Sequence, residues 1–355
     1  MKKAKRITLS IIITLFLLIV PGVCITAQQM NSHFQRCDYQ DPKLSATYFY
    51  DHYQPDYPRE EVSFRSGKNT LKGFIYGMDN DDGLIVFAHG IGSGHEVYLG
   101  LLTRLVDCGW RVFTYDASGC GYSDGDSTNG LAQSVIDLHN ALSFAESDPR
   151  LNSLDTCVLG HSWGGYAAAA VLNYDHNIRS CVSMSGYYLP VAELDEFCDS
   201  SFGIVSKLLY PYIWIYNNLK FRNYSSVSAV DGLNRSGIPA LIVHGNEDEI
   251  IGYNGASIIA QKDDISNPLV QYKVFSEPGR NGHNSYFYTP EFKEYKESVL
   301  DPLLDDLEKK YGDDVPDSER MKYVEKVDKD LYNGFSAEVV SMIDSFFRGE
   351  YPSEN

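Results

Sequence analysis

One seven-residue segment, Leu159-Gly160-His161-Ser162-Trp163-Gly164-Gly165, constrains the fold of this chain more than any other. It fits the pattern G-x-S-x-G, in which a serine sits on a tight turn between a strand and a helix. The flanks agree, because residues 156–159 are apolar and partly β-branched while residues 166–172 are strong helix formers. The alternative is a glycine-rich turn with an incidental serine. The strand before it and the helix after it favour a nucleophilic role for Ser162.

The rest of the chain alternates strands with helices. Expected strands cover residues 60–66, 70–76, 84–88, 111–116, 156–159, 178–184, 238–243 and 269–275, and helices of ten to fifteen residues separate several of them. The first two strands flank Gly67-Lys68-Asn69 and predict a hairpin. This rhythm predicts an α/β fold with a mostly parallel, eight-stranded sheet covered by helices on both faces.

Two segments interrupt this rhythm. Residues 186–237 are crowded with aromatic side chains and predict a cap inserted into the sheet domain, whose aromatics line an apolar pocket over Ser162. The alternative is that these aromatics pack against one another and the sheet, leaving only a short slot. Residues 290–333 form a charged helical insertion before the last amphipathic helix, Ser336 to Phe347.

The loop His89-Gly90-Ile91-Gly92-Ser93-Gly94 is a second chemical signal. Acyl transfer requires two N–H donors for the developing oxyanion, one after the nucleophile and one from the loop after this strand. Gly90 and Gly92 let the backbone curl so that the N–H of Ile91 points inward. An ordinary glycine-rich loop is the alternative. A phosphate-binding loop is excluded, because neither G-x-x-x-x-G-K nor G-x-G-x-x-G occurs here.

A serine nucleophile needs a histidine to accept its proton and a carboxylate to orient that histidine. Ser162, Asp248 and His283 occur in this order, and the last two each follow a predicted strand. Since the carboxyl ends of parallel strands meet at one edge of a sheet, these side chains are expected to converge. Glu247 and Glu249 are rivals for the acid. Asp116, before a run of alternating glycines, is interpreted as a turn former.

These motifs together resemble the α/β-hydrolase superfamily, and most of all the branch with monoacylglycerol lipase-like esterases and S33-type serine aminopeptidase domains. The motifs that carry the resemblance are His89-Gly90-Ile91-Gly92, Asp116…Gly119-Cys120-Gly121-Tyr122-Ser123, Gly160-His161-Ser162-Trp163-Gly164-Gly165, His244-Gly245-Asn246-Glu247-Asp248 and Gly282-His283-Asn284. The resemblance implies that Ser162 is the nucleophile, His283 the general base and acid, and Asp248 the orienting acid. It also implies that the backbone N–H groups of Ile91 and Trp163 form the oxyanion hole. The insertion 290–333 departs from the family pattern.

The N-terminus has the features of a targeting segment. Four basic residues within positions 2–6 precede an apolar run from Ile7 to Val20, and Pro21-Gly22 is expected to end the helix there. Residues 1–27 therefore predict either a secretory signal peptide cut near Ala27 or a membrane anchor, with cleavage favoured. Either one exports the remainder to secretion or to the outer face of the membrane. Residues 28–58 are interpreted as a linker or arm, and residues 59–355 as the hydrolase domain.

The composition limits the partners. A net charge of −18 argues against nucleic acid, which requires a basic face. Six cysteines follow residue 27, and this even number permits disulfides in an exported protein, but no C-x-x-C pair indicates a metal site. We expect no cofactor and no metal. The expected partner is a small-molecule ester or aminoacyl substrate, with membrane association only through the N-terminal apolar segment.

Three functions remain open at this point. The first is a serine hydrolase that cleaves carboxylic esters through an acyl-enzyme. The second is an S33-type aminopeptidase or amidase, in which acidic cap residues hold a free amine; the candidates are Glu193, Asp195, Glu196 and Asp199. A solvated acidic helix face is the alternative for these four. The third is a non-catalytic binding member of the fold.

Overall fold

The computed structural model describes residues 2–203, 206–312 and 314–350, without the side chains of residues 2–16, 18 and 202. Most side chains of the predicted targeting segment therefore lie outside the described part. The eight predicted strands form one sheet in the order β1-β2-β4-β3-β5-β6-β7-β8. Their bounds are β1 Arg59–Ser66, β2 Asn69–Tyr76, β3 Leu84–Ala88, β4 Arg111–Tyr115, β5 Thr156–His161, β6 Ile178–Met184, β7 Ala240–Gly245 and β8 Val270–Phe275.

The sheet is mostly parallel, as predicted. β2 pairs antiparallel with β1 and with β4, and every other neighbouring pair is parallel. All five residues of β3 are buried, which explains why its sequence is a continuous apolar run rather than an alternating one. The carboxyl ends of β3, β5, β7 and β8 carry the loops that the sequence singled out.

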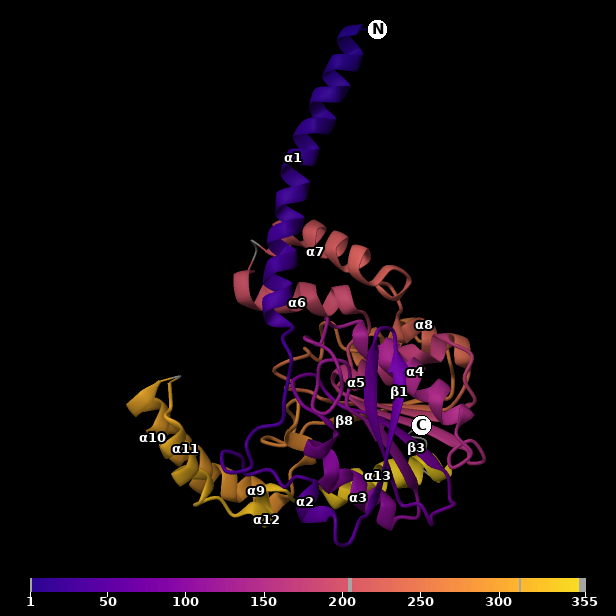
Figure 1. Cartoon of the computed structure of the whole chain (residues 1–355), viewed down its shortest axis with the longest axis vertical. Helices are drawn as coiled ribbons and strands as arrows, with labels where there is room; N and C mark the ends of the chain where they lie inside the picture. The colour runs from indigo at the N-terminus through magenta and orange to yellow at the C-terminus, as the bar shows by residue number, and fades with distance from the viewer. Residues whose placement is uncertain (1, 204–205, 313, 351–355) are drawn as a thin grey trace.

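Helices cover both faces of the sheet (Figure 1). Leu84 and Val86 of β3 belong to a core that includes residues of α4 (Gln133–Ser147), α5 (Trp163–Ala170) and α8 (Ala229–Ser236). Ile85 and Phe87 face the other way, into a core that includes residues of α3 (Leu99–Asp107) and α13 (Ala337–Arg348). Single 3₁₀ turns occur at residues 95–98, 171–173, 222–224, 259–264 and 285–287.

The predicted cap consists of α6 (Pro190–Phe202) and α7 (Ser206–Phe221), followed by α8. α1 (Lys2–His33) packs against α7, with Gly22 so close to Tyr212 that a side chain at position 22 would collide with its ring. The predicted helix end at Pro21-Gly22 is wrong, because α1 continues through Pro21. A proline inside a helix loses one N–H and crowds the carbonyl four residues earlier, and we attribute the continuation of α1 to its packing against α7. No helix in the described part of the chain is long and apolar enough to span a membrane.

The arm and the insertion lie together on one side of the sheet. The arm runs from the end of α1 to α2 (Tyr50–Tyr53), and in Figure 1 it passes beside the helices of the insertion. The insertion contains α9 (Pro290–Tyr295), a π-helical turn (Lys296–Leu300), α10 (Asp301–Tyr311), α11 (Asp317–Val324) and α12 (Lys329–Tyr332). All seven cysteines are free thiols.

Candidate active site

Ser162 occupies the turn between β5 and α5 in a strained backbone conformation. Its φ of 57° and ψ of −116° are rarely adopted by a residue with a side chain, and such strain persists only where the surroundings enforce it. The surroundings here are the two flanking glycines. A Cβ on Gly160 would collide with the carbonyl of Gly164, and a Cβ on Gly164 with the carbonyl of Ala88. The glycines therefore let β5, α5 and β3 come close enough to force the turn.

The Ser162 side chain faces a cavity of about 420 Å³. Its backbone N–H donates to Met184 O at 2.8 Å, which fixes the turn to the end of β6. Among the described residues its hydroxyl has no hydrogen-bond partner. His283 and Ile91 line the same cavity, so the structure brings three of the predicted site residues to one place.

Asp248 and His283 are in direct contact. His283 Nδ1 lies 2.9 Å from each oxygen of the Asp248 carboxyl, and both side chains are buried. The remaining ring nitrogen, Nε2, is thus left for a proton acceptor or donor role. No hydrogen bond joins Ser162 to His283 in the described chain, and in unliganded sites such contacts commonly tighten only when substrate binds.

The Asp248 carboxylate collects several donors. Its Oδ1 accepts from the backbone N–H groups of Ile250 and Ile251, and its Oδ2 lies 3.2 Å from His244 Nε2. Burial alone would raise the pKa of Asp248, but the hydrogen bonds from His244 and His283 outweigh it and hold the pKa well below its usual range. Asp248 is therefore an anion that keeps its neighbouring imidazole in one orientation.

The two rival acids lie elsewhere. Glu247 is exposed, and Glu249 Oε2 accepts from the backbone N–H of His283 at 3.0 Å. Glu249 thus positions the histidine loop without touching the imidazole. Only Asp248 of these three contacts the ring of His283 among the described residues.

A chain of hydrogen bonds in the wall of the cavity connects three loops. Tyr98 OH accepts from Gly90 N at 3.2 Å and lies 2.8 Å from His161 Nδ1, while His161 Nε2 lies 3.1 Å from the carbonyl of His283. Burial lowers the pKa of His161 to about 3, so its ring is neutral. Because a carbonyl only accepts, Nε2 carries the proton and Nδ1 accepts from Tyr98. Neither role was predicted from the sequence: Tyr98 belongs to no motif, and His161 stands beside the nucleophile in the serine motif, where the pattern allows any residue.

Ile91 follows Gly90 in the sequence, so the Tyr98 contact with Gly90 also restrains the backbone at Ile91. Neither the Ile91 N–H nor the Trp163 N–H donates to a protein acceptor among the described residues, and Trp163 opens α5. Ile91 lines the Ser162 cavity, whereas Trp163 follows Ser162 directly and is not among the lining residues. A free N–H after the nucleophile at a helix N-terminus, with a second one on a residue of the cavity wall, suits an oxyanion site.

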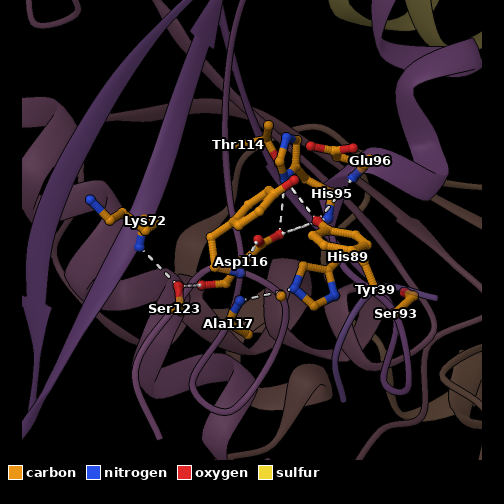
Figure 2. Close-up of polar contacts among 12 residues, drawn as sticks. Tyr39, Lys72, His89, Ser93, His95, Glu96, Thr114, Asp116, Ala117 and Ser123 are labelled. Carbon is orange, nitrogen blue, oxygen red and sulfur yellow. Dashed lines mark hydrogen bonds and ion pairs between the residues drawn. The ribbon is translucent and has the colours of Figure 1, made fainter. Parts of the chain in front are cut away.

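A second buried network holds the other end of the same loop (Figure 2). Asp116 Oδ1 accepts from Tyr39 OH at 2.7 Å and lies 2.8 Å from His95 Nδ1, while Oδ2 accepts from Tyr122 N. Burial would raise the pKa of Asp116, but the contacts with His95 bring it down to about 2. Asp116 closes its turn as predicted, and it also ties the arm to the loop that carries Ile91. His95 is fully buried, so this pair is out of reach of a substrate.

The predicted role of the cap is wrong. None of the described residues of 186–237, which leave out 204 and 205, lines the cavity that contains Ser162. Its walls come instead from Thr47 of the arm, from the segment around Tyr288 and Phe292, and from residues 332–335. Three cap aromatics are buried, Tyr187, Tyr216 and Phe221, and Tyr187 stacks on Tyr166 at 4.5 Å. Three others, Phe197, Tyr210 and Trp214, are exposed. The alternative interpretation, aromatics that pack against one another and the sheet, describes this segment better.

The acidic cap residues have other partners. Glu196 accepts from the backbone N–H groups of Gly252 and Ala256, and Asp195 and Asp199 pair with Lys207. Glu193 is buried with an unpartnered Oε2, and burial raises its pKa to about 8. These acids therefore do not form an exposed anionic cluster. No group of three or more His, Cys, Asp or Glu side chains in the described part is placed to hold a metal ion.

The sheet order defines the class by architecture: the chain has the α/β-hydrolase fold, as the resemblance implied. Residues 79–231 match the family described as serine aminopeptidase, S33. The match supports a hydrolase. It does not extend to the histidine loop or to the insertion.

Individual relatives are distant. The chain is 23% identical over 290 residues to an uncharacterized protein, YfhR, of Escherichia coli K12, covering 76% of this chain and 91% of that one. It is 27% identical over 141 residues to the polyketide transferase af380 of Aspergillus fumigatus, covering 39% of this chain and spanning about half (47%) of the transferase's length. The Pyrococcus furiosus esterase Pf2001 superposes with a TM-score of 0.54 at 15% identity, over 77% of this chain and 97% of that structure.

Proposed function

We propose that the protein is an exported serine hydrolase that cleaves carboxylic esters through an acyl-enzyme. In this mechanism Ser162 attacks the ester carbonyl while His283 Nε2 takes its proton. The N–H groups of Ile91 and Trp163 stabilise the oxyanion, and His283 returns the proton to the leaving alcohol. Water then repeats the sequence on the acyl-enzyme and releases the acid.

The observation that carries this proposal is the Asp248–His283 contact beside the strained serine. A carboxylate 2.9 Å from Nδ1 fixes the imidazole in the tautomer whose Nε2 can act as a base. The strained Ser162 and His283 line the same cavity. A catalytic role explains why both are there, whereas a purely structural histidine does not explain the strain at the serine.

Two alternatives are less well supported. An aminopeptidase of the S33 type would need an anionic group for the substrate's amine near the cavity. None of the four candidate acids lines the Ser162 cavity. Burial also keeps Glu193 neutral near pH 7. A non-catalytic binding protein would have no need to keep an orienting carboxylate with four donors.

The test is labelling and turnover by purified protein. Wild type should react with a fluorophosphonate probe and hydrolyse p-nitrophenyl butyrate, and Ser162→Ala should lose both while keeping its circular dichroism spectrum. A matched control, Ser143→Ala, removes an exposed hydroxyl on α4 that lines neither this cavity nor its loops, and should retain labelling. Labelling of Ser162→Ala would refute the nucleophile. Turnover of aminoacyl p-nitroanilides but of no ester would favour the aminopeptidase.

Export is tested separately. The basic residues before the apolar run support export. The intact mass of protein made in its host distinguishes a cleaved signal peptide from a retained membrane anchor. A mass that begins after residue 27 indicates cleavage, whereas full-length protein in the membrane fraction indicates an anchor. Full-length protein in the cytosol would contradict export.

A further inference from the structure

A second cavity adjoins the one that contains Ser162. Its volume is about 660 Å³, and it shares six lining residues with the smaller cavity: Thr47, Ser93, Val97, Tyr288, Phe292 and Tyr332. The two cavities therefore adjoin along the wall that these six residues form. We call the larger one the distal chamber. It is the space between the arm and the helical insertion, the two segments beside one another in Figure 1.

The walls of the distal chamber are built from apolar side chains. Leu300, Leu304, Leu307, Val315 and Val324 come from the insertion, and Leu44 and Phe49 from the arm. Leu304 is 44% exposed and Val97 39% exposed, so apolar surface faces the space. Exposed apolar area beside a reactive centre gains free energy when an apolar group covers it.

Several polar groups of the chamber wall are already paired. Lys296 Nζ lies 2.7 Å from Asp301, Asp38 pairs with Arg36, and Tyr39 OH donates to Asp116. A charged or strongly polar ligand would have to displace these contacts. The remaining charged wall residues, Glu308 and Arg320, are exposed at the rim.

The two walls are pinned to each other. Asn333 Oδ1 accepts from the backbone N–H of Tyr48 at 2.7 Å, and its Nδ2 donates to the carbonyl of Ala46 at 2.8 Å. Lys329 Nζ donates to Ser45 O, and Tyr48 OH to Asp330. Ala46 also packs in one apolar cluster with Phe292 and Leu300. We call these hydrogen bonds between the arm and the insertion the clasp at Asn333. They hold the two walls of the chamber at a fixed distance.

We propose that the distal chamber binds the far end of an aliphatic acyl chain whose ester carbonyl sits at Ser162. The inference rests on the proposed function, and it places the acyl subsite between the arm and the insertion instead of beneath the cap. Each methylene buried there should raise kcat/KM about fourfold, provided its burial is expressed in the transition state. Specificity should therefore continue to rise with chain length after the smaller cavity is full.

The test compares p-nitrophenyl esters from acetyl to hexadecanoyl, below their aggregation limits. Leu304→Trp fills the chamber from an exposed position. Its matched control, Leu219→Trp, adds the same ring to an exposed leucine (69%) on the cap helix α7, away from both cavities. We expect Leu304→Trp to leave kcat/KM for the butyryl ester within twofold and to lower that for the dodecanoyl ester at least tenfold. Leu219→Trp should change neither.

Two outcomes would overturn the chamber while leaving the esterase proposal intact. One is a wild-type kcat/KM that falls steadily from the acetyl ester onward, and the other is equal slowing of all esters by Leu304→Trp. If wild type hydrolyses no ester, the proposed function fails instead. The chamber is then judged by displacement of a fluorescent fatty acid by dodecanoate. Binding to wild type that Leu304→Trp weakens at least tenfold supports the chamber, and equal binding or none refutes it.

Discussion

Replacing Tyr98 with phenylalanine removes one oxygen from the centre of the site. That hydroxyl accepts from Gly90 N at 3.2 Å and lies 2.8 Å from His161 Nδ1, and the residue is only 7% exposed. The change leaves a buried N–H and a buried imidazole nitrogen without partners. Each unsatisfied buried group costs about 1–3 kcal/mol, so together they should lower the free energy of unfolding by about 2–6 kcal/mol. A typical domain is stable by about 5–15 kcal/mol, so this loss is easy to measure.

The same change should affect catalysis. Gly90 directly precedes Ile91, whose N–H is proposed to stabilise the oxyanion, and loss of one such donor costs roughly 100-fold or more in kcat. Because Tyr98→Phe only loosens the donor's position, we expect kcat to fall about tenfold while KM changes little.

The measurements are urea unfolding followed by tryptophan fluorescence and initial rates on the butyryl ester. The control is Tyr57→Phe, whose hydroxyl donates to the exposed carboxylate of Asp107 and should be nearly neutral. A Tyr98→Phe protein as stable and active as Tyr57→Phe would refute the coupling between Tyr98, the oxyanion loop and His161.

Three further predictions concern other parts of the site. Asp248→Asn should lower kcat by about 10³–10⁴-fold because the tautomer of His283 is no longer fixed, while Glu249→Gln should cost far less; the reverse order in ester assays would mean that the acid is wrongly assigned. Glu193 is neutral in the fold up to about pH 8 but ionised in the unfolded chain above about pH 5. Wild-type stability should therefore fall as pH rises through this window, by at most about 1.4 kcal/mol per unit. Glu193→Gln should remove the slope, so its advantage in melting temperature should grow from pH 5 to 8; a constant difference would contradict the buried neutral acid. Gly164→Ala should lower the melting temperature by roughly 10 °C, because its Cβ collides with the Ala88 carbonyl, and calorimetry showing an unchanged transition would disprove that steric account.

The sequence predicted those parts of the structure that depend on local patterns. The continuous apolar run of β3 and the run Ala240-Leu241-Ile242-Val243 of β7 identify buried strands, since such residues suit a core on both faces of the sheet. The turn at Ser162 follows from its glycines. Asp248 and His283 meet because the loops after parallel strands share an edge, which is a property of the fold class rather than of either residue.

The walls of the cavities could not be predicted in this way. Their position depends on how Asn333 pairs with the arm, and an asparagine in a helical, charged segment looks like any surface residue. The aromatic content of the cap pointed to a pocket there, but Tyr187 and its neighbours are used for packing. Pro21 misled for a related reason, because contact with α7 decides whether a helix continues through a proline.

The clasp at Asn333 links the assembly of the chamber to the order in which the chain folds. Tyr48 and Asn333 are 285 residues apart, and closing so long a loop is slow until the intervening sheet has brought its ends together. The sheet and the serine turn can therefore form before the chamber does. A molecule caught at that stage would hold a complete catalytic group and yet discriminate poorly among acyl lengths, so chain-length selectivity should recover later than activity toward short esters during refolding.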